Sequence, residues 1–148
     1  MQIRLILVII LLLAGCASGS VIITGNKRPP ICLPIQQNMS ESAQAERRAC
    51  LETIKLYSQE PKEYEVIGFV EATGKSGWTK QDKTNYAVKK LKELAAEIGA
   101  NGVLLTSLGD KHAMVGGAMP MYGGGAIMYA APVDQPSISG KAIYVIKE

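Results

Sequence analysis

Residues 79 to 99 read TKQDKTNYAVKKLKELAAEIG, and this stretch decides the fold. Its apolar residues recur at helical spacing and fall on one face: Ala87, Leu91, Leu94, Ala95 and Ile98. Thr79 with Asp82 three positions later is a variant of the capping box, and Gly99 stands where helices commonly end. The pattern therefore predicts a helix over about residues 80–98, whose apolar face must pack on another element.

Runs of β-forming residues flank this helix on both sides. Glu65 to Ala72 is bounded by Pro61 and by Gly74, and Val103 to Leu108 follows a tight turn. Farther on, two runs are typical of a closing hairpin, and the last of them is apolar on both faces, which favours a central strand. We predict an α+β fold, in which one main helix covers one face of a small mixed sheet. Its strands are expected at about 64–72, 102–108, 125–131 and 139–147.

The segment before the first of these strands divides into two parts. Ala17 to Gln37 is rich in Ser, Gly, Pro and Asn, so residues 16–37 are interpreted as a flexible tether with a semi-rigid proline end. Residues 38–62 are interpreted as an insert, with a short helix from Ser40 to Leu51 and an edge strand near residues 53–57. The α+β domain then spans residues 63–148.

The N-terminus carries the pattern of an export signal. Arg4 precedes an aliphatic run that ends in Leu13-Ala14-Gly15-Cys16, which is a lipobox. The pattern predicts a lipoprotein signal peptide over residues 1–15 and a covalent lipid on Cys16, which would anchor the protein to a membrane. An uncleaved transmembrane anchor is the alternative, but the apolar run is shorter than the roughly 20 residues that a bilayer requires. No aspartate follows the cysteine, so we expect the outer membrane, on its periplasmic side.

Cys32 and Cys50 then remain as an even pair in a chain predicted to enter an oxidising compartment. A disulfide between them is the leading interpretation. The competing interpretation is a buried thiol at Cys50 on the short helix and a free loop thiol at Cys32. A metal site is weaker, because neither cysteine has a histidine or another cysteine at ligand spacing.

Composition argues against several classes of function. The chain has 16 basic and 13 acidic residues, and on the predicted helix lysines and acids are interspersed. A nucleic-acid partner is therefore not expected. His112 is the single histidine, and no nucleophile motif accompanies it, which disfavours an enzyme. Trp78 is expected to cap the edge of the core. No cofactor is expected other than the covalent lipid.

Residues 110–125 combine glycine with methionine, which predicts a flexible apolar loop. We interpret this loop as the contact for a periplasmic protein or cell-wall partner, through Met119, Met121 and Tyr122. The alternative is a Cu(I) or Ag(I) site, because thioether and imidazole groups suit soft metals. Its ligands would be His112, Met114, Met119 and Met121. The simplest explanation of the methionines is that they fill irregular apolar gaps.

Several segments together resemble a family of small bacterial lipoproteins, and the part from about residue 63 to 108 is similar to YbjQ-like domains and to the stress-sensor lipoprotein of the Rcs envelope pathway. The matching segments are Thr24 to Ile31, Ile54 to Tyr57, Tyr64 to Gly68, Gly77-Trp78, Ile98 to Leu105 and Ser139 to Tyr144. The resemblance implies a small α+β fold and a role in envelope sensing. The sensor's cysteine pattern does not map onto Cys32 and Cys50, and no metal-ligand set carries over.

Overall fold

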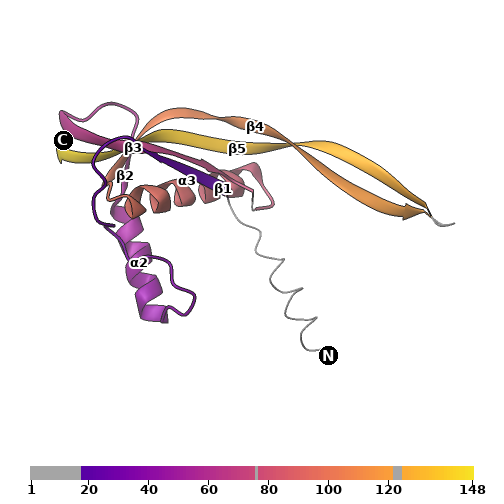
Figure 1. The fold of residues 1–148 in the computed structure, drawn as a ribbon, viewed down its shortest axis with the longest axis horizontal. Helices are drawn as coiled ribbons and strands as arrows, with labels where there is room; N and C mark the ends of the chain where they lie inside the picture. The colour runs from indigo at the N-terminus through magenta and orange to yellow at the C-terminus, as the bar shows by residue number, and fades with distance from the viewer. Residues whose placement is uncertain (1–17, 76, 122–124) are drawn as a thin grey trace.

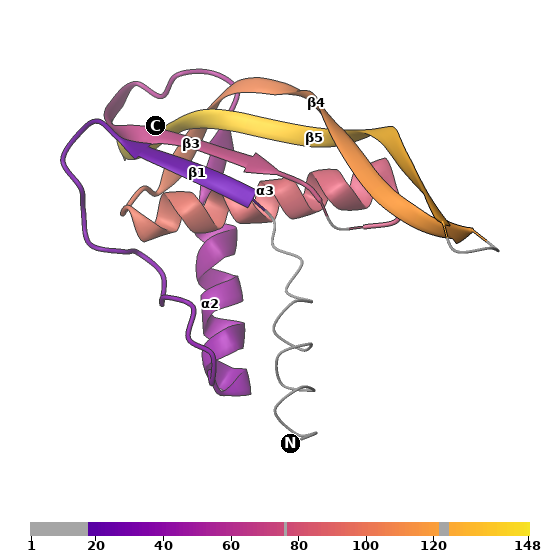
Figure 2. The same cartoon turned by 45° about the vertical axis from the view of Figure 1, so that its right-hand side comes forward.

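The computed structural model describes residues 18–75, 77–121 and 125–148. These residues form one five-stranded sheet with α3 packed on one face, and α2 runs away from α3 on the side opposite the sheet (Figures 1 and 2). The strand order is β1-β3-β5-β4-β2. The elements are β1 (Ser18–Ile23), α2 (Glu41–Thr53), β2 (Lys55–Tyr57), β3 (Glu63–Thr73), α3 (Lys80–Glu97), β4 (Gly102–Met121) and β5 (Gly125–Lys147).

The sheet is mixed, as the sequence predicts for an α+β fold. Strand β2 pairs with β4 in parallel at one edge, and the other neighbouring strands are antiparallel. Strand β5 lies between β3 and β4, so its final segment is covered on both sides by other strands. Ala142 and Ile143, which point to opposite faces of the strand, are both fully buried, in agreement with the two apolar faces of this segment in the sequence.

Helix α3 begins and ends where the local sequence predicts. Thr79 accepts a hydrogen bond from the backbone of Asp82, and the Asp82 carboxylate accepts one from the backbone of Thr79. Gly99 has a φ of 83°, a left-handed conformation that glycine adopts without strain. Ala87 and Leu91 are completely buried against the sheet, so the predicted apolar face is confirmed.

Residues 18–23 correct the prediction of a tether over residues 16–37. They form β1, which pairs antiparallel with β3 from Ser18 opposite Thr73 to Ile23 opposite Gly68. Strand β1 covers an edge of β3 that would otherwise leave its backbone groups unpaired. The following segment is also fixed, because Gly25 N–H donates to the carbonyl of Ile67 at 2.8 Å. The short aliphatic cluster Val21 to Ile23 was too weak a sign of this pairing, since the partner strand lies about 50 residues away.

The C-terminal part of the chain differs from its prediction in the same way. The strands expected at 125–131 and 139–147, with a turn between them, are one continuous strand, β5. The loop expected over residues 110–125 is mostly strand, because β4 continues to Met121 and pairs with β5 throughout. Beyond the level of Ser137, β5 has β4 on one side and no longer pairs with β3. Pro132 and Pro136 are tolerated there because no described strand pairs with the open edge of β5, so a proline without an N–H interrupts no strand pairing on that edge.

Candidate functional site: a projecting two-stranded arm

We call residues 109–121 of β4 and 125–137 of β5 the arm. Their pairing runs from Gly109 opposite Ser137 to Met121 opposite Gly125. At roughly 3.3 Å per residue, each strand of the arm is about 40 Å long. Figure 1 shows that the arm extends past the start of α3 and that none of the other described elements lies along it. Apart from the base, where the Gly74 N–H donates to the carbonyl of Pro136, both outer edges of the ribbon are therefore open in the part of the chain that the structure describes.

The base of the arm is fastened to the rest of the domain by polar contacts. Lys111 of β4 forms an ion pair with Glu71 of β3, and the Ser137 hydroxyl donates to the same carboxylate at 2.9 Å. The hydrogen bond from Lys111, followed by that from Ser137, lowers the pKa of Glu71 below its usual value. Lys80 at the start of α3 also pairs with Asp110 at 2.7 Å. The base is thus held by both the sheet and the helix.

His112 follows Lys111 on β4, farther from the base, and makes a contact across the arm. Its Nδ1 is 2.7 Å from Oδ1 of Asp134, the residue directly opposite it in the register. Both side chains are largely exposed, so the pair contributes at most about 1 kcal/mol to the arm.

The predicted soft-metal ligands do not gather at one place. His112 and Met114 lie in the half of the arm nearer the base, whereas Met119 and Met121 lie at its far end. Met114 and Met119 are five residues apart on an extended strand, a separation of about 17 Å. The described residues also contain no group of three His, Cys, Asp or Glu side chains placed to hold a metal.

For the predicted partner contact, the register places Met119 and Met121 near the tip of the arm. Tyr122, the third residue of that prediction, lies outside the described residues. Cys16, the predicted lipid attachment site, also lies outside them.

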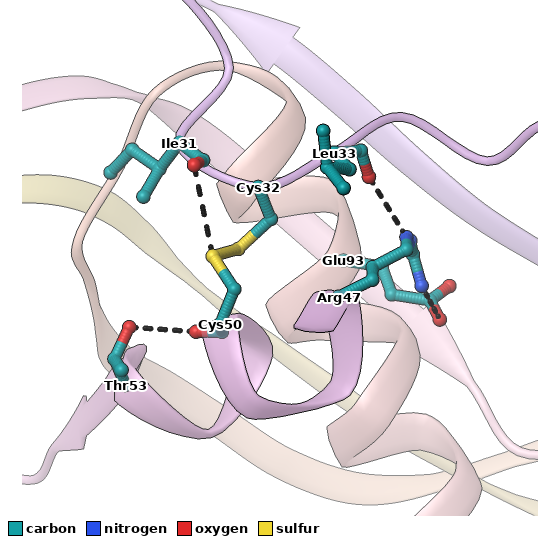
Figure 3. Close-up of a disulfide and its surroundings, with 7 residues drawn as sticks. All are labelled: Ile31, Cys32, Leu33, Arg47, Cys50, Thr53 and Glu93. Carbon is teal, nitrogen blue, oxygen red and sulfur yellow. Dashed lines mark hydrogen bonds and ion pairs between the residues drawn. A yellow bond between two sulfur atoms is a disulfide. The ribbon is translucent and has the colours of Figure 1, made fainter. Parts of the chain in front are cut away.

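The disulfide between Cys32 and Cys50 is confirmed, and Figure 3 shows its surroundings. It joins the segment before α2 to the last turns of α2. Beside it, Arg47 donates through Nε to the carbonyl of Leu33 at 3.0 Å and pairs with Glu93 of α3 at 3.2 Å. The line drawn from the Cys50 sulfur to a carbonyl is a 3.7 Å contact, since a disulfide sulfur carries no hydrogen to donate. The disulfide and the contacts of Arg47 therefore hold α2 against α3.

Two further surfaces were not anticipated from the sequence. A groove of about 410 Å³ lies between α2 and α3, with Leu51 and Val88 in its floor and Arg48, Lys89 and Lys92 among its walls. The groove depends on how α2 crosses α3, which no local pattern specifies.

The second surface surrounds Trp78. We expected this side chain to cap the edge of the core, but it is fully exposed. The prediction was wrong because Gly74, four residues before Trp78, packs directly against the backbone of α3 and leaves no space there for the Trp78 side chain. A Cβ atom on Gly74 would lie only 1.8 Å from the carbonyl oxygen of Lys83.

Comparison with protein-family models, with curated proteins and with solved structures finds no match to this chain. The resemblance to envelope lipoproteins therefore stays an expectation. None of the described helices is both long enough and apolar enough to cross a membrane.

Proposed function

We propose that this chain is a non-enzymatic, lipid-anchored protein of the bacterial cell envelope whose arm docks on a periplasmic partner. The observation that supports the proposal is the arm itself. A two-stranded ribbon without a covering layer is marginally stable at best in water. A partner that covers the ribbon would supply the missing layer.

The described surface of the arm has the properties of a docking element. Met128 near its tip is 79% exposed, and Leu108, the residue of β4 directly before the arm, is 71% exposed. Beyond Leu104, the last residue of β4 that pairs with β2, the outer edge of β4 presents free backbone groups. An extended segment of another protein can pair with such an edge by adding a strand. This chemistry favours a protein partner over the cell wall.

The lipid anchor rests on the lipobox around Cys16 and on the basic and aliphatic residues before it. The mature N-terminus tests it directly by mass spectrometry. An acylated Cys16 as the first residue supports the proposal, and an unmodified cysteine or a retained Met1 contradicts it.

The arrangement of polar side chains agrees with a binding role. His112 and Asp134 form the contact most similar to an acid–base pair, but both are exposed on the arm and line none of the described grooves. General acid–base catalysis requires such a pair to face a bound substrate.

Site-specific photo-crosslinking in living cells tests the partner proposal. A photoreactive residue at position 108 or 128 should give a discrete cross-linked protein. The matched control is position 146, because Ile146 is also an exposed aliphatic residue on β5 but lies at the opposite end of the strand from the arm. Identical products from positions 128 and 146, or no product from the arm, would contradict the proposal.

Titration of the purified protein with Cu(I) tests the alternative function. The separation of Met114 from Met119 along β4 argues against a site built by all four predicted ligands of one chain. Stoichiometric binding that is lost in a Met119→Leu, Met121→Leu variant would nevertheless overturn the partner proposal in favour of soft-metal binding.

A further inference from the structure

We propose that the surface around Ser18 and Trp78 rests directly on the lipid bilayer, with the Trp78 indole at the membrane interface. This inference rests on the proposed lipidation of Cys16. It adds to that proposal the orientation of the domain and the side chain that makes the contact.

The length of the connection is the first step of the argument. Ser18 is already part of β1 and lies opposite Thr73 of β3. Only two peptide links separate it from Cys16, which allows at most about 7 Å between the two Cα atoms. A longer connection would require β1 to detach from β3, which would expose Val21, a residue packed on the core. An acylated Cys16 therefore holds this end of the sheet at the bilayer surface.

The second step is the set of residues that share this end of the domain. Thr73, the partner of Ser18, leads through Gly74 and the following turn to Trp78 and α3. Figures 1 and 2 both show the start of β1 beside the end of β3. Gly74 packs directly against α3, and Gly77 adopts a φ of 122° that only glycine tolerates well. Trp78, the next residue, therefore lies just before the start of α3, at the same end of the domain as Ser18.

The chemistry of Trp78 is the third step. Its side chain is fully exposed, although tryptophan is a large apolar group with one polar N–H. Such side chains concentrate at membrane interfaces, where the ring is buried and the N–H reaches polar groups. A bilayer held beside the start of β1 by Cys16 lies at the same end of the domain as Trp78, so it offers the indole this environment without any other partner.

Charge does not dominate the proposed contact. Lys111, which borders the same surface as Ser18, is paired with Glu71, and Lys80 is paired with Asp110. These two cations are therefore balanced by acids. Lys75 and Lys83, which adjoin Gly74 in sequence and in space, take part in none of the ion pairs among the described residues and leave a small positive charge. We expect the contact to form on zwitterionic phosphatidylcholine as well as on vesicles that contain anionic phosphatidylglycerol.

Trp78 is the single tryptophan of the chain, so its fluorescence reports this contact without labelling. The full-length lipidated protein is reconstituted into phosphatidylcholine vesicles, and quenching by headgroup-level brominated or spin-labelled lipid is compared with quenching by aqueous iodide. We expect strong quenching by the lipid probe, a blue-shifted emission and loss of most iodide quenching. The control is a Trp78→Phe, Ile146→Trp variant, which moves the probe to an exposed position at the far end of β5 and should stay sensitive to iodide.

A second variant tests the short connection itself. A flexible Gly-Ser insert of twelve residues between Ala17 and Ser18 should restore iodide quenching of Trp78, and unchanged lipid quenching would overturn the argument from length. Mass spectrometry of the same sample distinguishes the membrane contact from the lipid anchor on which it rests. An acylated Cys16 with Trp78 still open to iodide would overturn the membrane contact alone, whereas an unmodified Cys16 would overturn the lipid anchor on which it rests. A cross-link from position 78 to a protein in cells, with no lipid quenching, would also overturn the membrane contact.

Discussion

Removal of the disulfide by a Cys32→Ser, Cys50→Ser double substitution should lower the free energy of unfolding by about 3 kcal/mol. The two cysteines are 18 residues apart in sequence. Closing a loop of this length removes roughly 11 cal/mol/K of entropy from the unfolded chain, which is about 3 kcal/mol at 25 °C. The effect is therefore expected mainly in the unfolded state.

The folded state should keep its geometry without the disulfide. Arg47 still donates to the carbonyl of Leu33 and pairs with Glu93, and these two charged side chains are only 11% exposed. The backbone N–H of Ile31 still donates to the carbonyl of Ala96 at 3.1 Å. These contacts join the segment before α2 to α3 independently of the sulfur atoms.

Urea denaturation followed by circular dichroism measures this change. Trp78 fluorescence is unsuitable as the probe, because the side chain is already exposed in the folded protein. A secreted form that begins at Ala17 avoids detergent, and its oxidised and reduced states provide a second comparison with unchanged sequence. Without the cross-link, the unfolded chain exposes more surface, so the slope of free energy against urea should also rise. A loss of less than about 1 kcal/mol, with an unchanged slope, would refute the loop-closure argument.

Three further predictions concern the core, the junction of the helices and the base of the arm. Leu91→Ala should destabilise the protein by about 2–5 kcal/mol, because it leaves a cavity under α3. The control, Lys90→Ala, should cost less than about 1 kcal/mol. Equal losses of stability in thermal or urea unfolding would mean that the buried face of the helix is misassigned. Arg47→Ala should cost about 1.5–3 kcal/mol, because it removes the closer of the two cations that pair with the buried Glu93 and leaves only Lys90, at 3.6 Å. Arg48, the exposed neighbour of Arg47, should tolerate alanine, and similar unfolding midpoints for the two variants would count against this. The pKa of Glu71 is lowered in the folded state, so its contribution is complete above the unfolded value near 4.5 and is lost as pH falls through the folded value. Amide exchange at the base of the arm should therefore quicken from neutral pH to about pH 3, after correction for intrinsic rates, and Glu71→Gln should remove this dependence.

Local signals in the sequence predicted the elements that local interactions form. The Thr79 and Asp82 cap, the apolar spacing of α3 and the glycine at its end act within a few residues of one another, and each is found as expected. The short helix after Ser40 and the edge strand near residue 55 follow from the same kind of signal. The pairing of Cys32 with Cys50 was also accessible, because an even pair in a chain predicted to be exported has few alternatives.

Contacts between distant segments decided the rest. Residues 18–23 read SGSVII, and an aliphatic run this short does not distinguish a tether from an edge strand. The open edge of β3 makes it a strand. The glycines and methionines after residue 109 favour a loop when taken alone, but pairing with β5 supplies backbone hydrogen bonds that override this local preference. Trp78 is a large apolar side chain of the kind expected in the core, yet the close approach of Gly74 to α3 leaves it exposed. The sequence by itself therefore determined the elements with short-range signals, whereas the tertiary structure decided the arm and the pairing of β1 with β3, because β pairing depends on partners far along the chain.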